Sequence, residues 1–304
     1  IGISLFPGDA LSPEQLLRNA DSALFKAKGA GRDGYALYTE ELTAHAQQRV
    51  ATAVELRRAL EQQELRVYYQ PVHDLRTRRL VGVEALVRWE HPQRGLVPPA
   101  EFIPIAERTG LIAQIDAWVM QQACQQMCQW LQAGVALSFV AVNVSSRLFA
   151  RRELFQQVAK ILHETGLDPA CLELEVTESA VMEDPEVALE QMHRMRELGV
   201  RLAIDDFGTG YSSLLRLKRL PVQKLKIDQG FVAGLPWDED DAAIVRVIIA
   251  LAQSMGMQVH AEGIEQVEQA GFLLEHGCDL GQGYWFGRPV PAGQLDWMRA
   301  PEIR

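Results

Sequence analysis

The 304-residue sequence predicts an α/β fold: a (β/α)8 TIM-like barrel with its first strand antiparallel, preceded by a small N-terminal α/β fragment. Three observations support this prediction. Short apolar runs recur from residue 64 onward, helical patterns separate most of them, and polar side chains stand at the ends of several runs. Alternating strands and helices are typical of a parallel sheet, and about eight strands over roughly 235 residues fit a closed barrel.

The segment before the barrel, residues 1–38, reads as a strand (IGISLF), a turn, a helix and a short strand. Residues 12–14 (Ser-Pro-Glu) are a helix start signal, and Gly29 is a stop signal. Residues 39–63 are rich in helix formers without a breaker, which predicts one long linker helix. The chain begins without Met or a basic-then-apolar leader, so we expect a piece of a longer protein.

Eight apolar runs supply the predicted barrel strands. They are LRVYYQPV (65–72), LVGVEALVRW (80–89), FVAVNVS (139–145), CLELEVTE (171–178), VRLAIDDFG (200–208), KLKID (224–228), QVHAEGI (258–264) and GQGYWFG (281–287). Only the short loop DLRTRR joins the first two runs, which indicates an antiparallel first strand.

Helical patterns separate the later runs. They cover residues 152–166, 184–199, 241–256 and 265–277. A doubly wound open sheet is the structural rival of the barrel. That fold would need a nucleotide-binding fingerprint after its first strand, and the sequence has none there.

Composition excludes several classes of function. No apolar run reaches the roughly 18 residues of a membrane span. The net charge of -10 argues against a nucleic-acid polymer as partner, because such binding needs a positive surface. A small anionic substrate is compatible if bound cations reverse the local field. The four cysteines predict reduced core thiols rather than a zinc site, and a cytoplasmic location, with a membrane anchor upstream of residue 1 left open.

Polar residues stand late in or just after the predicted strands. They are Glu84, Asn143, Glu175, Asp205, Asp206, Lys226, Glu262 and Gln282. Because the carboxyl ends of barrel strands meet at one face, these side chains should converge. Each alone has an ordinary explanation: a solvated acid, a surface lysine or an asparagine that caps a helix. Their repetition from strand to strand favours a site.

Carboxylates within the barrel suggest metal ions. In LELEVTE the apolar residues share one parity, which turns Glu175 toward the lumen. Uncompensated buried ions cost several kcal/mol each, and bound cations would remove that cost. Asp205 and Asp206 end a strand just before a glycine-containing loop, where the alternation of directions ends. Oxygen ligands suit Mg²⁺ or Mn²⁺, and two such ions can clamp a phosphoryl displacement.

The segments around these residues resemble EAL-domain phosphodiesterases, which hydrolyse cyclic di-GMP, from about residue 50 to residue 300. The matching segments are Glu84-Ala85-Leu86 with Arg88-Trp89-Glu90-His91-Pro92, Asn143-Val144-Ser145, Glu175-Val176-Thr177-Glu178, residues 205–210 (DDFGTG), Lys226-Ile227-Asp228, Ala261-Glu262-Gly263-Ile264-Glu265 and Gln282-Gly283-Tyr284. The tripeptide alone carries no weight, but the ordered set is specific.

The resemblance implies a two-metal site and hydrolysis of cyclic di-GMP to linear pGpG. One ion, Mg²⁺ or Mn²⁺, would be held by Glu84, Asn143, Glu175 and Asp205. Asp205, Asp206 and water would hold the other.

The resemblance also implies roles for the remaining residues. Lys226 would position or deprotonate the attacking water, and among cations its pKa would be depressed; Glu84 and Glu262 are the other catalytic candidates. The candidates for substrate binding are Arg88, Gln282, Leu86 and Asp228. The supporting candidates are Glu178, Glu265, Gly208 and Ser212. Glu178 would anchor the backbone of the loop from Gly208, and an ordinary helix cap is an equal alternative at Ser212.

Residues 1–38 resemble the C-terminal end of a GGDEF domain, so we expect that fragment at 1–38, a linker helix at 39–63 and the EAL barrel at 64–304. The expected partners are cyclic di-GMP, an upstream GGDEF or sensor domain and a second copy of the chain. Two alternative functions remain. One is a silent receptor that binds cyclic di-GMP; the other is an aldolase with a Schiff base at Lys226.

Overall fold

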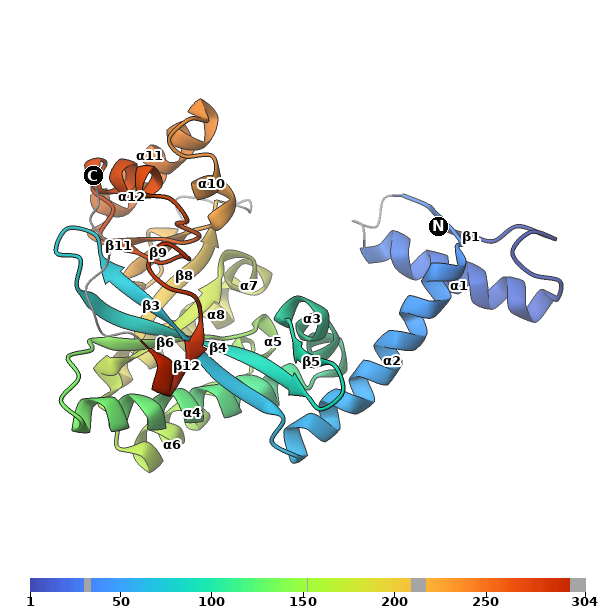
Figure 1. Ribbon diagram of the computed structural model, residues 1–304, viewed down its shortest axis with the longest axis horizontal. Coiled ribbons are helices and arrows are strands. Elements are labelled where there is room, and N and C mark those ends of the chain that lie inside the picture. Colours follow the sequence, from blue (N-terminus) through green and yellow to red (C-terminus); the bar gives the residue numbers. More distant parts are fainter. Residues whose placement is uncertain (30–33, 152, 209–216, 296–304) are drawn as a thin grey trace. The chain divides into compact units, whose positions relative to one another are not determined.

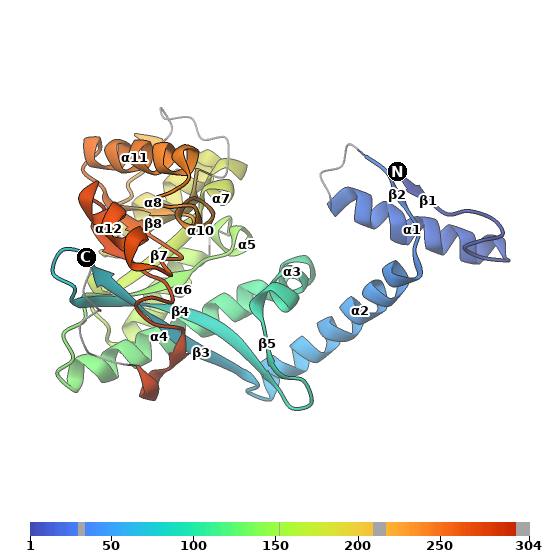
Figure 2. The ribbon, with the colours of Figure 1, turned by 45° about the horizontal axis from the view of Figure 1, so that its top comes forward.

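Eight strands close a barrel in the larger of two structural units (Figures 1 and 2). The structure is a computed structural model that describes residues 1–29, 34–151, 153–208 and 217–295. The barrel strands are β3 (Leu65–Asp74), β4 (Leu80–His91), β6 (Phe139–Asn143), β7 (Leu172–Thr177), β8 (Arg201–Phe207), β9 (Lys224–Ile227), β10 (Gln258–Ala261) and β11 (Leu280–Gly281).

The pairing of the strands gives the topology. From β4 through β6, β7, β8, β9 and β10 to β11, each strand pairs in parallel with the next. Strand β3 closes the ring and runs antiparallel to both β4 and β11. The predicted (β/α)8 barrel with an antiparallel first strand is therefore confirmed.

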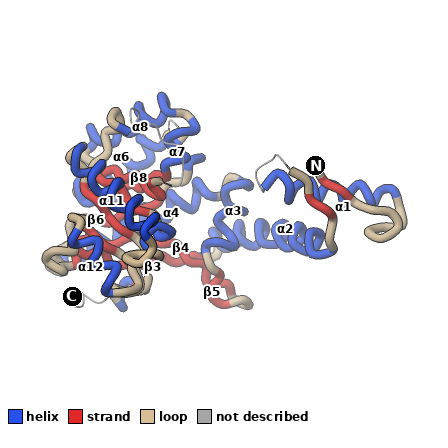
Figure 3. The backbone as a smooth tube through the Cα atoms, turned by 90° about the horizontal axis from the view of Figure 1, so that it is seen from above, coloured by secondary structure: helices blue, strands red, loops and turns tan. Residues whose placement is uncertain are grey.

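Helices cover the outside of these strands, as the helical segments around the red strands in Figure 3 show. In the barrel unit they are α4 (Ile112–Gln132), α5 (Ser146–Phe149), α6 (Leu154–Thr165), α7 (Glu178–Glu183), α8 (Pro185–Leu198), α10 (Gln229–Ala233), α11 (Glu239–Ser254) and α12 (Val267–Glu275). Local signals set the helix starts: the Asp184 and Asp238 carboxylates accept hydrogen bonds from the first turns of α8 and α11.

The alternation along β7 divides its side chains between two environments. Leu172, Leu174 and Val176 are fully buried. Glu173 and Glu175, of the opposite parity, form ion pairs with lysines of β9, so they point into the lumen. Apolar side chains fill the lower lumen, in a cluster of Val72, Phe139, Ala141 and Leu280. The carboxylates at the upper rim therefore stand on a packed core.

Gly82 of β4 makes room for the Phe139 ring in that core. A Cβ atom at Gly82 would lie 2.5 Å from Phe139 Cζ, a separation that forces neighbouring atoms to move. We expect Gly82→Ala to lower the free energy of unfolding by about 1–3 kcal/mol through overpacking, measured as a shift of the urea midpoint. Gly293→Ala, where nothing lies within 4 Å, is the matched control. Equal midpoints for the two variants would contradict this account of the lumen.

The last predicted strand is much shorter than its apolar run. Only Gly281 of the segment 281–287 belongs to β11. The chain then turns and binds the loop after β10: Ile264 N–H donates to the Gln282 carbonyl, and Trp285 N–H donates to the Ile264 carbonyl. A Cβ atom at Gly283 would collide with the Ile264 backbone, so this close approach requires glycine. Strands β5 (Gly95–Val97) and β12 (Val290–Pro291) extend β4 and β3 outside the ring.

The second unit comprises Ile1–Gln63 and Ala100–Thr109. In it β1 (Gly2–Ile3) pairs in parallel with β2 (Ala36–Leu37), and α1 (Pro13–Gly29) lies between them in sequence. Helices α2 (Glu40–Glu61) and α3 (Pro99–Thr109) complete its regular structure. The predicted strand at IGISLF is thus reduced to two residues. The assignment of residues 1–38 to a GGDEF remnant stays a prediction. Across the described residues, no helix has the length and apolar character to cross a membrane.

Candidate active site

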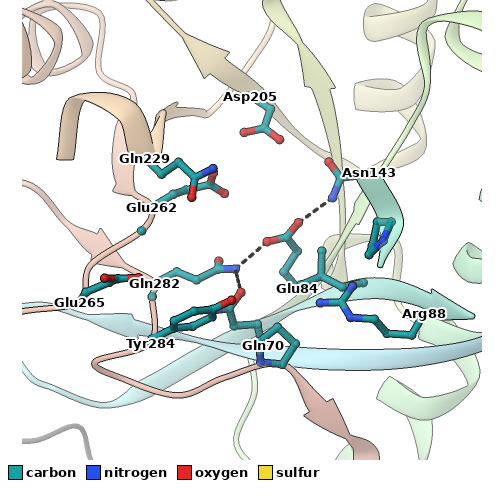
Figure 4. A pocket seen from close by; sticks show the side chains of 15 residues that line it. Gln70, Glu84, Arg88, Asn143, Asp205, Gln229, Glu262, Glu265, Gln282 and Tyr284 are labelled. Carbon is teal, nitrogen blue, oxygen red and sulfur yellow. Dashed lines mark hydrogen bonds between the residues drawn. The ribbon is translucent and has the colours of Figure 1, made fainter. Parts of the chain in front are cut away.

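A pocket of about 480 Å³ lies where the barrel strands end (Figure 4). Eight of the predicted site residues line it: Glu84, Leu86, Arg88, Asn143, Asp205, Glu262, Glu265 and Gln282. They come from strands and loops far apart in the sequence, as expected for the carboxyl ends of barrel strands. The sequence-predicted convergence of these side chains is therefore present.

Amide side chains hold the Glu84 carboxylate from both sides. Asn143 Nδ2 donates to Glu84 Oε1 at 2.6 Å, and Gln282 Nε2 donates to Glu84 Oε2 at 2.6 Å. Gln282 Nε2 also donates to Gln70 Oε1 at 2.9 Å, and Gln70 Nε2 donates to the Gly287 carbonyl at 3.1 Å. This network, drawn in part in Figure 4, fixes the direction in which Glu84 presents its oxygens.

Lys226 is fully buried and joins three carboxylates. Its ammonium lies 2.6 Å from Glu175 Oε2, 2.6 Å from Glu262 Oε1 and 3.2 Å from Asp205 Oδ1. Burial lowers the pKa of Lys226, but the carboxylates of Asp205, Glu175 and Glu262 outweigh that effect and raise it well above its ordinary value. From the sequence we expected bound cations to depress the pKa of Lys226; without cations, the surrounding side chains raise it instead. Without a metal ion, the surrounding carboxylates favour the charged form of the Lys226 amine.

Asp205, Asp206 and Glu262 form a cluster whose carboxylate oxygens lie within 4.8 Å of one another. The backbone at Asp206 has a φ of 53°, and the β8–β9 register shifts between Ile204 and Phe207. This left-handed residue ends the strand's alternation, so both neighbouring acids reach the same place. Burial, then the nearby Asp205, raises the pKa of Asp206 to about 6.

The carboxylates of the site fit a divalent cation. Glu175 Oε1 is buried and has no hydrogen-bond partner among the described residues. Burial raises the pKa of Glu175 well above its usual value, the Lys226 ammonium lowers it, and Glu84 and Asp205 raise it further. Burial likewise raises the pKa of Glu262 to about 8, again opposed by Lys226. Several buried acids facing one lysine need further positive charge, and a hard cation supplies it.

The substrate-binding candidates occupy different places. Arg88 and Leu86 line the pocket. Burial lowers the pKa of Arg88, partly offset by Glu84, and its Nη1 donates to the Val87 carbonyl at 2.8 Å. Asp228 is absent from the pocket lining: it caps α10 by accepting from Gly230 N–H at 2.8 Å, and it hydrogen-bonds Asp206.

The supporting candidates also lie in different parts of the site. The Glu178 carboxylate accepts a hydrogen bond from Gly208 N–H at 3.0 Å, the contact that the resemblance implies for this loop. Glu265 is exposed and lines the pocket, with its backbone N–H donating to Gln269 Oε1. Ser212 lies outside the described residues.

Three pocket residues with polar side chains were not among the predicted site residues: Gln70, Gln229 and Tyr284. Gln70 is the register partner of Glu84, and it joins the site because β3 closes the ring. The sequence signal was weak, since Gln70 is one polar residue inside an apolar run. Tyr284 stood within the matching segment Gln282-Gly283-Tyr284, so that motif was the available signal.

Comparison with known proteins gives a consistent match. The family model described as the EAL domain matches residues 53–289. The chain is 47% identical over 295 residues to the bifunctional diguanylate cyclase/cyclic di-GMP phosphodiesterase MucR of Pseudomonas aeruginosa, covering 97% of this chain and 43% of MucR. It is 37% identical over 292 residues to the cyclic di-GMP phosphodiesterase PdeR of Escherichia coli, covering 96% and 44%. The chain thus spans less than half the length of these relatives.

Solved structures agree with this match. A cyclic di-GMP complex of the P. aeruginosa MucR phosphodiesterase superposes with a TM-score of 0.79 at 48% identity, over 81% of this chain and all of that one. The EAL domain of Mycobacterium smegmatis DcpA gives a TM-score of 0.66 at 37% identity, over 76% and 95% of the two chains.

Proposed function

The chain belongs to the EAL-domain family, and from that premise we propose that its barrel hydrolyses one phosphodiester bond of cyclic di-GMP and releases linear pGpG. The observation that carries the proposal is the buried Lys226, whose ammonium bonds Glu175, Asp205 and Glu262 beside a pocket bordered by Arg88. Carboxylates can hold catalytic metal ions, and a lysine and an arginine can stabilise negative charge on a phosphate.

The pocket suits a phosphorylated guanine compound. Arg88 offers a planar guanidinium, which donates paired hydrogen bonds to phosphate oxygens. Tyr284 is 50% exposed at the pocket; the Arg288 guanidinium lies over its ring, 4.0 Å from the centroid, and a base could join this stack. The cyclic di-GMP bound in the MucR structure and the names of the relatives support the same substrate here.

The proposal includes two divalent cations, Mg²⁺ or Mn²⁺. Glu84, Asn143, Glu175 and Asp205 would hold one, and Asp205 with Asp206 would hold the other. When bound, the ions would neutralise phosphate charge and lower the pKa of a water molecule. The unpartnered Glu175 Oε1 and the cluster around Asp205 support this assignment.

The chain's own residues orient the reacting groups. Lys226, whose ammonium bonds Glu175, Asp205 and Glu262, would position the attacking water and stabilise negative charge that develops at the phosphate. Glu262 lies 2.6 Å from the Lys226 ammonium and lines the pocket, and burial raises its pKa, so it is a second acid–base candidate. Glu84, held by Asn143 and Gln282, keeps its oxygens in a fixed direction. A Schiff-base role for Lys226 is disfavoured, since three carboxylates enclose its amine.

The proposal extends to partners of the longer protein. An upstream GGDEF or sensor domain would precede residue 1. We propose that the barrel lies in the cytoplasm, whether or not the longer protein has a membrane anchor. A homodimer is proposed too, because α11 exposes Ile244 and Val247, three residues apart on one face. Sedimentation equilibrium with Val247→Glu tests the dimer: the wild type should be dimeric and the variant monomeric.

The test of the function is direct. The purified chain with Mn²⁺ or Mg²⁺ is expected to convert cyclic di-GMP to pGpG, followed by liquid chromatography, and excess EDTA is expected to abolish product. Tight binding of cyclic di-GMP without product in either ion would favour the silent receptor instead. Neither binding nor turnover would reject both assignments.

A further inference from the structure

A second buried ion pair lies below the site, one step down the same two strands. Lys224 Nζ lies 2.6 Å from Glu173 Oε1, and the two side chains are only 2% and 3% exposed. Glu173 lies two residues before Glu175, and Lys224 lies two residues before Lys226; Glu175 and Lys226 form the upper pair. The lumen therefore contains two parallel lysine–glutamate pairs, and the activity proposed above uses only the upper one.

Both pairs cross the lumen face of β8, which separates β7 from β9. On β8 the residue level with Glu175 and with Lys224 is Ala203. Its methyl group is fully buried and small enough to let both lysine side chains cross. Each lysine of β9 thus reaches across β8 to a glutamate of β7.

The Lys224 ammonium is held in place from two sides. It lies 3.9 Å from the centroid of the Phe139 ring, a favourable cation–π position, and it donates to Glu173. His260, buried beside both lysines, carries no negative charge that could pair with Lys224; burial first, then the charges of Lys224 and Lys226, lower its pKa and favour the neutral ring.

Glu175 is level with Lys224 in the sheet, since both are register partners of Ala203. It lies two residues along the same face of β7, and its Oε1 has no hydrogen-bond partner among the described residues. A lysine released from Glu173 would keep its charge only by approaching an anion, because an unpaired buried ammonium is costly. The flexible lysine stem allows that shift.

We propose that Glu173 is a positioning residue that holds the Lys224 ammonium away from Glu175, so that Glu175 stays available to a divalent cation. The inference rests on the proposed metal site and adds a residue that touches neither ion nor substrate. Its physical basis is charge: a second ammonium against Glu175 repels a cation strongly where water is excluded.

The experiment titrates Mn²⁺ alone into the metal-free chain by isothermal calorimetry. Glu173→Gln is expected to weaken Mn²⁺ binding roughly tenfold or more, since it frees Lys224 without removing its charge. The double variant Glu173→Gln/Lys224→Met removes both charges and is expected to bind within about threefold of wild type. Glu173→Asp, which keeps the charge, is also expected to retain most of the affinity. Thermal melts in EDTA confirm that each variant is folded.

A purely structural role would give a different pattern. Glu173→Gln within about threefold of wild type, or a double variant as weak as the single one, would overturn the inference. If Glu173→Gln does not fold, Lys224→Met replaces it: this variant should bind Mn²⁺ at least as tightly as the double variant, and weaker binding would overturn the proposal. A wild-type chain that binds no Mn²⁺ would overturn the metal assignment and this inference together.

Discussion

Replacing Glu175 by Gln is expected to remove metal binding and hydrolysis together. The substitution keeps the shape of a fully buried side chain but removes the charge of the carboxylate whose Oε1 faces no partner among the described residues. Loss of one anionic ligand is expected to weaken Mn²⁺ binding by about 100-fold or more, since even changes next to metal ligands cost roughly 10–100-fold. Calorimetric titration with Mn²⁺ and turnover of cyclic di-GMP measure the two effects.

The same variant is expected to be at least as stable as wild type when EDTA is present. The raised pKa of Glu175 means that the folded chain disfavours its charge. An acid whose pKa is higher in the folded chain than in the unfolded chain stabilises the fold fully at pH values below its unfolded pKa. This stabilisation is lost as pH rises through the folded pKa, so the stability of Glu175→Gln relative to wild type should increase with pH. Glu164→Gln, at an exposed pair with Lys160, is the matched control and should change nothing. Full activity of Glu175→Gln would reject its place among the ligands.

Replacing Lys226 by Ala is expected to separate metal binding from turnover. The variant loses the ammonium that bonds Glu175, Asp205 and Glu262, while every proposed metal ligand remains. We expect kcat to fall about 100-fold or more, the range for losing a group that positions or transfers a proton. Mn²⁺ affinity should stay equal or increase, because a competing cation is gone.

Stability provides a second readout for this variant. Without Lys226, three acids face one another unpaired, so unfolding in EDTA should become easier by about 3–5 kcal/mol. Added Mn²⁺ should restore more stability to the variant than to wild type, because only the folded chain binds it. Lys160→Ala, a surface change, is the control for expression and folding. An unchanged kcat for Lys226→Ala would show that the lysine has no catalytic role.

The sequence predicted the parts of the fold that depend on local patterns. Alternating apolar runs located the barrel strands, and the parity of LELEVTE placed Glu175 in the lumen, where it bonds Lys226. Strand register escaped prediction, and with it Gln70, whose place beside Glu84 depends on the pairing of β3 with β4. The shortness of β11 also escaped, because the turn after Gly281 is set by backbone contact with Ile264.

Charge coupling was the other property that the sequence concealed. The parity of LELEVTE places Glu173 on the same face as Glu175, but nothing in the sequence pairs Glu173 with Lys224, and only the barrel brings the two to 2.6 Å. The direction of the Lys226 pKa likewise depends on which of three distant carboxylates reach its ammonium. The left-handed backbone at Asp206 explains why Asp205 and Asp206, although adjacent, reach the same place; regular strand alternation would point them to opposite faces.

The central claim is that acids from β4, β7 and β8 hold a divalent cation at the end of the barrel. Anomalous diffraction from crystals grown with Mn²⁺ tests it most directly. The predicted result is a manganese peak bounded by oxygens of Glu84, Asn143, Glu175 and Asp205. A chain that hydrolyses cyclic di-GMP in excess EDTA, with no peak among those oxygens in the Mn²⁺ crystals, would contradict it.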